Sequence, residues 1–169
     1  MTNTLFEFIG KVFSTWGSAG DFHAISEAHM KSALFLRIAS ALTMLMCLGH
    51  TGGVFSSPRH GAEEIAVLET MKAHHFNVMG SMRTYWDFLF GYGLILAIGL
   101  LVQAILFWQL AGFVKTNPIL IRPILALFFF NCIGTAILSW KYFFIGPAVT
   151  QLLVAACLGL AFATAAVSR

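Results

Sequence analysis

The stretch FLFGYGLILAIGLLVQAILFWQL, Phe88–Leu110, decides the fold class of this chain. It contains no charged residue, and a helix needs about 20 consecutive, mostly apolar residues to cross the hydrocarbon core of a membrane. Three further stretches have the same character, at about 33–52, 118–140 and 147–168. The sequence therefore predicts four membrane-spanning helices.

The composition agrees with this interpretation. Apolar residues make up 59% and charged residues 10% of the 169 residues, whereas soluble globular proteins contain about 45–50% and about 25%. A net charge of +3 without a Lys/Arg cluster argues against nucleic acid as a partner. The three cysteines form no CxxC, and there is no haem, nucleotide or disulfide motif, so no cofactor is favoured.

The lengths of the links predict the architecture. Short links after the second and third spans force consecutive helices to run antiparallel as neighbours. We expect a single all-α domain over residues 1–169, an integral membrane antiparallel four-helix bundle. An amphipathic helix at about 4–16 is expected to lie in the membrane interface. A loop helix at about 58–79, which Gly80 would close, is expected to cover the bundle as a lid.

The positive-inside rule gives an orientation. Six basic residues lie on the side of the two termini and four on the side of the long first link, which predicts cytoplasmic termini. These two groups are Lys11, Lys31, Arg37, Lys115, Arg122 and Arg169, and Arg59, Lys72, Arg83 and Lys141.

Polar residues within the spans indicate a candidate binding site. An unpartnered polar group is costly in hydrocarbon, so such residues usually face the interior of a bundle. The first span carries an arc that contains Arg37, Ser40, Thr43, Met44, Cys47, His50 and Thr51. We expect a polar-lined cavity beneath the loop helix. Its ligand-binding residues would be Tyr85, Tyr92, Asn131, Thr135, Gln151 and Arg83.

Four titratable residues at that end of the bundle are candidate catalytic groups. They are His50, Asp87, Glu64 and His75. A histidine beside a carboxylate can act as an acid–base pair, because burial and charge coupling tune its pKa near neutrality. The alternative is a structural role, in which salt bridges hold the loop helix against the bundle.

Metal binding is a further possibility at the same place. His50, His60, Glu64 and His75 would be the ligands, with zinc or iron as the metal. None of the spacings HxxxH, ExxH or HExxH occurs among the loop residues, so no metal site is favoured.

Two segments carry a resemblance to known proteins. HTGG at 50–53 and MRTYWDF at 82–88 resemble an uncharacterised family of small bacterial four-span membrane proteins, over the chain from about Ala33 to the end. The resemblance implies a bacterial inner membrane and no known reaction. The layout is also similar to DoxX-like proteins and to sterol-isomerase and sigma-2-receptor-type bundles. Thiol oxidoreductases linked to quinone or vitamin K share it, but they require a CxxC.

Three functions follow as hypotheses. The first is a pocket that binds, and could act on, a hydrophobic small molecule or lipid from the surrounding bilayer. The second is a non-catalytic accessory subunit of a membrane complex, or a homo-oligomer, favoured by the small-residue seam Ala155, Gly159 and Ala163. The third is a metal-dependent membrane enzyme.

Overall fold

The computed structural model describes residues 19–55 and 61–165, with side chains from 26 onward in the first range. Five helices and two short strands follow one another along these residues. They are α2 (Ala19–Phe55), α3 (Ala62–Ala73), β1 (His75–Val78), β2 (Ser81–Thr84), α4 (Tyr85–Phe113), α5 (Pro118–Tyr142) and α6 (Ile145–Thr164).

The prediction of four long apolar helices is confirmed. Four helices are long and apolar enough to cross a membrane: Ser26–Phe55 of α2, and the whole of α4, α5 and α6. The first span is longer than the predicted 33–52 because its helix continues through Gly52 and Gly53 to Phe55. The predicted interfacial helix at 4–16, His60, and the last residues of the predicted fourth span lie outside the described residues.

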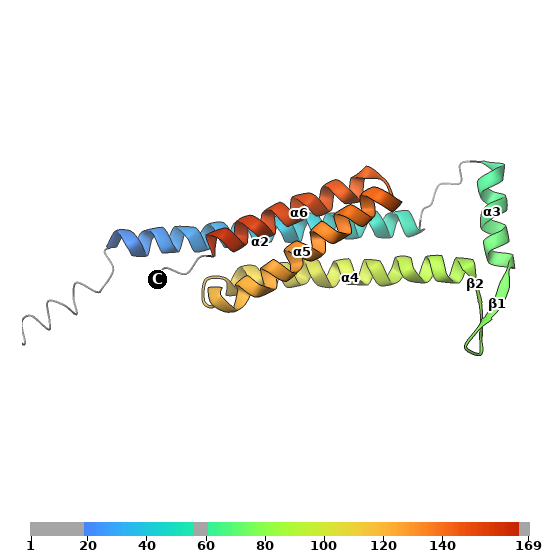
Figure 1. Ribbon diagram of the computed structural model, residues 1–169, viewed down its shortest axis with the longest axis horizontal. Coiled ribbons are helices and arrows are strands. Elements are labelled where there is room, and N and C mark those ends of the chain that lie inside the picture. Colours follow the sequence, from blue (N-terminus) through green and yellow to red (C-terminus); the bar gives the residue numbers. More distant parts are fainter. Residues whose placement is uncertain (1–18, 56–60, 166–169) are drawn as a thin grey trace, which may run out of the picture.

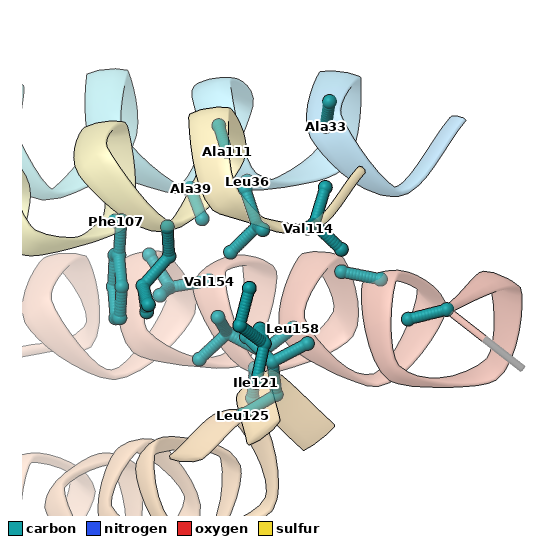
Figure 2. Close-up of a cluster of buried hydrophobic side chains, with 14 of the residues drawn as sticks. Ala33, Leu36, Ala39, Phe107, Ala111, Val114, Ile121, Leu125, Val154 and Leu158 are labelled. Atoms are coloured by element: carbon teal, nitrogen blue, oxygen red, sulfur yellow. The ribbon is translucent and has the colours of Figure 1, made fainter. Parts of the chain in front are cut away.

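The long helices pack in a fixed order. α2 lies between α4 and α6, α5 packs on the other side of α6, and α4 has few contacts with α5 (Figure 1). The buried core sits toward the end of the molecule where α4 connects to α5. Alanines at 33, 39, 155 and 161 are buried and let the helices approach closely. Leu36, Phe107, Leu125 and Leu158 fill the space between the helices (Figure 2).

The small-residue seam on α6 is confirmed at two of its three positions. Ala155 is buried in the core. At Gly159 an added Cβ would lie 3.4 Å from Cε2 of Phe129, so α5 packs closely on α6 there. Ala163 is exposed, because the buried face of α6 continues through Leu158 and Ala161 instead.

The loop helix is shorter than predicted, and the chain is not all-α. α3 ends at Ala73, and residues 75–84 form an antiparallel hairpin in which His75 pairs with Thr84 and Val78 with Ser81. Met79 and Gly80 both have positive φ, 50° and 85°, as in a type I′ turn. The Asn77 side chain accepts a hydrogen bond from the Gly80 amide at 2.8 Å. Gly80 therefore closes a hairpin rather than a helix.

The hairpin leads directly into α4. The Thr84 hydroxyl accepts a hydrogen bond from the Asp87 amide at 3.1 Å, and the Asp87 carboxylate accepts one from the Thr84 amide at 2.8 Å. This reciprocal pair is a capping box, which satisfies two backbone donors that a helix start leaves free. α3 and the hairpin lie across the end of the long helices (Figure 1).

Candidate functional site

A row of side-chain contacts joins α2 to α4. The Ser40 hydroxyl donates a hydrogen bond to the carbonyl oxygen of Ala104 at 2.7 Å, and Cys47 Sγ lies 3.4 Å from that of Ala97. His50 Nε2 lies 2.9 Å from the carbonyl oxygen of Gly93. Positions rise along α2 as they fall along α4, so the two helices run in opposite directions. The polar arc predicted on the first span thus supplies contacts between helices.

The two helices also pack tightly beside the His50 contact. A Cβ added at Gly93 would lie 2.9 Å from Cγ2 of Val54, which is closer than real Cβ contacts. The ring of Phe55 packs edge-on against that of Phe90, with centroids 5.8 Å apart. Absence of a side chain at Gly93 therefore allows the carbonyl oxygen to come within reach of His50.

An apolar cavity lies further along the same pair of helices. It has a volume of about 320 Å³, and Ser40 and Ala104, which share the hydrogen bond above, both line it. The remaining lining residues are Ala41, Met44, Ile105 and Trp108. Ala41, Ile105 and Trp108 are exposed, so the cavity opens on the outside of the helix pair.

A cation stands at one wall of this cavity. The guanidinium carbon of Arg37 lies 5.4 Å from the centre of the Trp108 ring, which is within the range of a cation–π contact. Among the described side chains, no carboxylate forms an ion pair with Arg37. Arg37 therefore places a positive charge without a described counter-ion beside the apolar cavity.

The hydrogen bonds of His50, Asp87 and His75 go to different partners, although the charge of His75 acts on the Asp87 carboxylate. His50 contacts Gly93 across the helix pair, and Asp87 caps α4 through Thr84. Glu64 is exposed on α3, and His75 is exposed on β1 with Nδ1 2.8 Å from the carbonyl oxygen of Ala73. Among the described residues, no three His, Cys, Asp or Glu side chains are grouped so that they could hold a metal ion.

Two of the candidate ligand-binding residues of the hairpin and α4, Tyr85 and Tyr92, lie in an aromatic cluster. Tyr85 stacks on His74, with centroids 5.5 Å apart, and contacts Phe76 at 4.8 Å. Tyr92 is exposed and lies beside Phe88 on the same helix. Arg83 donates a hydrogen bond to the carbonyl oxygen of the preceding residue at 2.8 Å.

The remaining three lie on α5 and α6. Gln151 is 4% exposed, its Nε2 lies 3.5 Å from Sδ of Met46, and its Oε1 has no hydrogen-bond partner among the described residues. Thr135 donates its hydroxyl to the carbonyl oxygen of Asn131 at 2.8 Å. Asn131 is exposed on the outside of α5 and Thr135 is half-buried, so Gln151 alone of the three is buried in the interior.

The sequence does not predict that the α4 residues of the cavity belong to a site. Ser40, Met44 and Arg37 belong to the predicted arc on the first span, but Trp108 and Ile105 read as ordinary apolar positions of the second. A tryptophan near the end of one span, opposite an arginine near the start of the neighbouring span, is the signal that pairs them. Using that signal requires the register of the two helices, which the polar contacts supply.

The fold and the cavity define this chain as a helical protein with four helices long and apolar enough to span a membrane. Comparisons with protein family models, curated proteins and solved structures find no match to it.

Proposed function

We propose that this chain is a multi-pass protein of a bacterial inner membrane, in which the four long helices form an antiparallel bundle with both termini in the cytoplasm. Charge supports this orientation. Where α4 meets α5, the described residues include Lys31, Arg37, Lys115 and Arg122, with Asp21 and Glu27 as the acids. The opposite end carries Glu63, Glu64, Glu69 and Asp87 with Lys72, Arg83 and Lys141. Basic residues favour the cytoplasmic side.

Within that membrane, the chain holds one anionic lipid in the cavity between α2 and α4. The observation that carries this proposal is the position of Arg37 against Trp108, with an apolar cavity on one side and no described carboxylate nearby. An apolar cavity beside a cation that has no described counter-ion matches a molecule with a hydrocarbon chain and a negatively charged head.

The cavity suits an acyl chain. Its volume of about 320 Å³ lies at the lower end of the range of small-molecule sites. Methyl, methylene and ring carbons from Ala41, Met44, Ile105 and Trp108 form most of the wall. Because the cavity is open on the outside of the helix pair, a lipid enters it sideways from the bilayer without crossing the protein.

Arg37 suits the head of that lipid. A guanidinium binds a phosphate through two parallel hydrogen bonds, which are stronger when donor and acceptor are charged. The cytoplasmic leaflet carries the anionic lipids that Arg37 would meet in the proposed orientation. None of the six lining residues carries a group that titrates near neutral pH, so the cavity supports binding rather than acid–base chemistry.

Native mass spectrometry of the full chain with phosphatidylglycerol and phosphatidylcholine tests the proposal. We expect one phosphatidylglycerol per chain to survive dilution of the lipid, and Ala41→Phe to abolish its retention by filling the cavity. Ala156→Phe, at an exposed alanine of α6, is the matched control and should leave retention unchanged. Equal retention in both variants would overturn the proposal.

The head group is tested separately. Arg37→Gln should remove the preference for phosphatidylglycerol over phosphatidylcholine, whereas Arg122→Gln should keep it. Arg122→Gln removes one positive charge at the same end of the helices as Arg37→Gln. The guanidinium of Arg122 lies 4.4 Å over the Phe162 ring, away from the cavity. Loss of the preference in both variants would indicate general attraction to anionic lipid instead of a site.

The site expected beneath the loop helix stays a prediction.

A further inference from the structure

A regular stripe of exposed residues runs along the outside of α5. Its members follow one another at alternating steps of four and three, and each is exposed: Leu120, Ile124, Leu127, Asn131, Gly134 and Leu138. Alternating steps of four and three form the contact seam of two helices that supercoil around each other. None of these residues belongs to the core between the four helices or to the α2–α4 cavity.

Asn131 is the polar member of this stripe and lies near the middle of the helix. It is 13 residues from Pro118 and 11 from Tyr142, the two ends of α5, which corresponds to about 20 Å and about 16 Å at 1.5 Å per residue. Its backbone carbonyl accepts the Thr135 hydroxyl, but no hydrogen bond of its side-chain amide to a described residue is found. In the membrane location proposed above, on which this inference rests, an amide exposed to hydrocarbon at this depth lacks the water that would satisfy it.

We propose that α5 associates with α5 of a second copy of this chain, and that the two Asn131 amides hydrogen-bond to each other. Two copies in one membrane are related by a two-fold axis along the membrane normal, so each residue on the axis lies at the same depth as its counterpart. An amide carries both a donor and an acceptor. Asn131 therefore meets a complementary group at the depth where it needs one.

Gly134 permits the approach that this hydrogen bond requires. It lies one turn after Asn131 in the same stripe, and a Cβ added there would have no atom within 4 Å. The described residues of one copy thus leave the space over Gly134 unfilled. Small residues at the contact let two membrane helices come close, and polar side chains then hydrogen-bond across them. Leu127 and Leu138 flank the pair and supply apolar contact on both sides.

The same features favour a second copy over a different protein or a lipid. A different partner would need its own polar group at the depth of Asn131, whereas a second copy supplies one by symmetry. Phospholipid acyl chains offer no donor or acceptor at the middle of the bilayer. A single asparagine in the seam also fixes the register, because shifting one helix along the other would leave both amides unpaired.

Cysteine cross-linking in vesicles tests the contact in the full chain. Cys47, Cys132 and Cys157 are first replaced by alanine, and one cysteine is then placed at position 138 or 137. Leu138 lies in the stripe and Ile137 beside it, and both are exposed at nearly the same depth. We expect a disulfide-linked dimer with Leu138→Cys and several-fold less with Ile137→Cys. Equal cross-linking at the two positions would overturn the proposal.

Energy transfer between labelled copies in phosphatidylcholine vesicles tests the role of Asn131. Asn131→Leu should weaken self-association by about threefold to thirtyfold, the range that one hydrogen bond between membrane helices gives. Asn131→Gln should retain most of it. Because Asn131 is exposed, Asn131→Leu should leave the thermal unfolding of the monomer unchanged. Wild-type chains that stay monomeric at all dilutions, or that cross-link in cells to a different protein, would overturn the proposal.

Discussion

The Nε2 atom of His50 lies 2.9 Å from the carbonyl oxygen of Gly93, so an imidazole on α2 contacts the backbone of α4. This contact is possible because Gly93 has no side chain. A Cβ at Gly93 would collide with Val54, which lies one turn after His50 on α2. Along the pair, the Ser40 hydroxyl makes the equivalent bond to Ala104. The two bonds fix the register of the helices, and that register brings Trp108 beside Arg37.

Gly93→Ala should destabilise the protein. The new Cβ would lie 2.9 Å from Cγ2 of Val54, and a valine in a helix has little rotamer freedom to move away. Overpacking of this kind costs about 1–3 kcal/mol. Thermal unfolding in detergent measures the change. The double variant Val54→Ala with Gly93→Ala should recover most of the loss.

Gly99→Ala is the matched control on the same helix. A Cβ at Gly99 meets no atom within 4 Å, and alanine favours a helix over glycine by about 0.8–1.0 kcal/mol. We expect unchanged or slightly raised stability. Similar losses from both substitutions would show that the effect comes from helix flexibility and not from the Val54 contact.

Breaking the His50 contact should loosen the α2–α4 pair. His50→Ala should cost about 0.6–1.7 kcal/mol, the range of hydrogen bonds between membrane helices. Cys47→Ala should cost less, because the thiol is a weak donor and lies 3.4 Å from its acceptor. Urea or detergent titration of unfolding provides both values. A larger loss for Cys47→Ala would contradict the assigned contacts.

The capping box gives Thr84 and Asp87 a structural role at the start of α4. This role differs from the catalytic role predicted for Asp87. Thr84→Ala should destabilise the start of α4 by about 1 kcal/mol, the usual loss for an N-cap, whereas Thr84→Ser should be nearly neutral. Hydrogen exchange at the amides of residues 85–88 reports on this turn. Unchanged protection in Thr84→Ala would mean that the capping bonds do not hold α4.

Sequence patterns predicted the four long helices because an apolar run of about 20 residues has few other stable structures in a membrane. They did not predict the hairpin, because Met79-Gly80 lacks the Asn-Gly or Asp-Gly signal of a type I′ turn. The sequence therefore predicts a helix through His75 to Val78, which are extended in the structure. These residues pair with Ser81 to Thr84 as strands, and this pairing outweighs their local propensity for a helix.

Of the two helices that line the cavity, only α2 could be assigned to a site from the sequence. The polar arc of α2 was visible from its period, but its partner depends on the order in which the helices pack. Because α5 packs on α6 and has few contacts with α4, Asn131 faces outward, although its polarity had placed it in the interior. A polar residue in a span indicates that a partner exists, and does not say whether the partner belongs to the same chain.

Relieving the backbone strain at Met79 should stabilise the hairpin. Met79 has a φ of 50°, a conformation that costs most residues with a side chain about 1–2 kcal/mol and that asparagine tolerates better. Met79→Asn should therefore slow hydrogen exchange at the Ser81 amide. Met82→Asn, at an exposed methionine of β2 with ordinary backbone geometry, should not. Faster exchange in Met79→Asn would contradict the turn.

Quenching of Trp108 fluorescence by brominated lipids tests the proposed lipid site most directly, because this side chain forms its wall. Trp16, Trp86 and Trp140 are replaced by phenylalanine, and a variant that keeps Trp86 alone is the control. A charge-assisted contact of about 1.5 kcal/mol gives about a tenfold preference. Brominated phosphatidylglycerol should therefore quench Trp108, but not Trp86, at about tenfold lower mole fraction than brominated phosphatidylcholine, and Arg37→Gln should remove the difference. Equal quenching of Trp108 by both lipids would contradict the account.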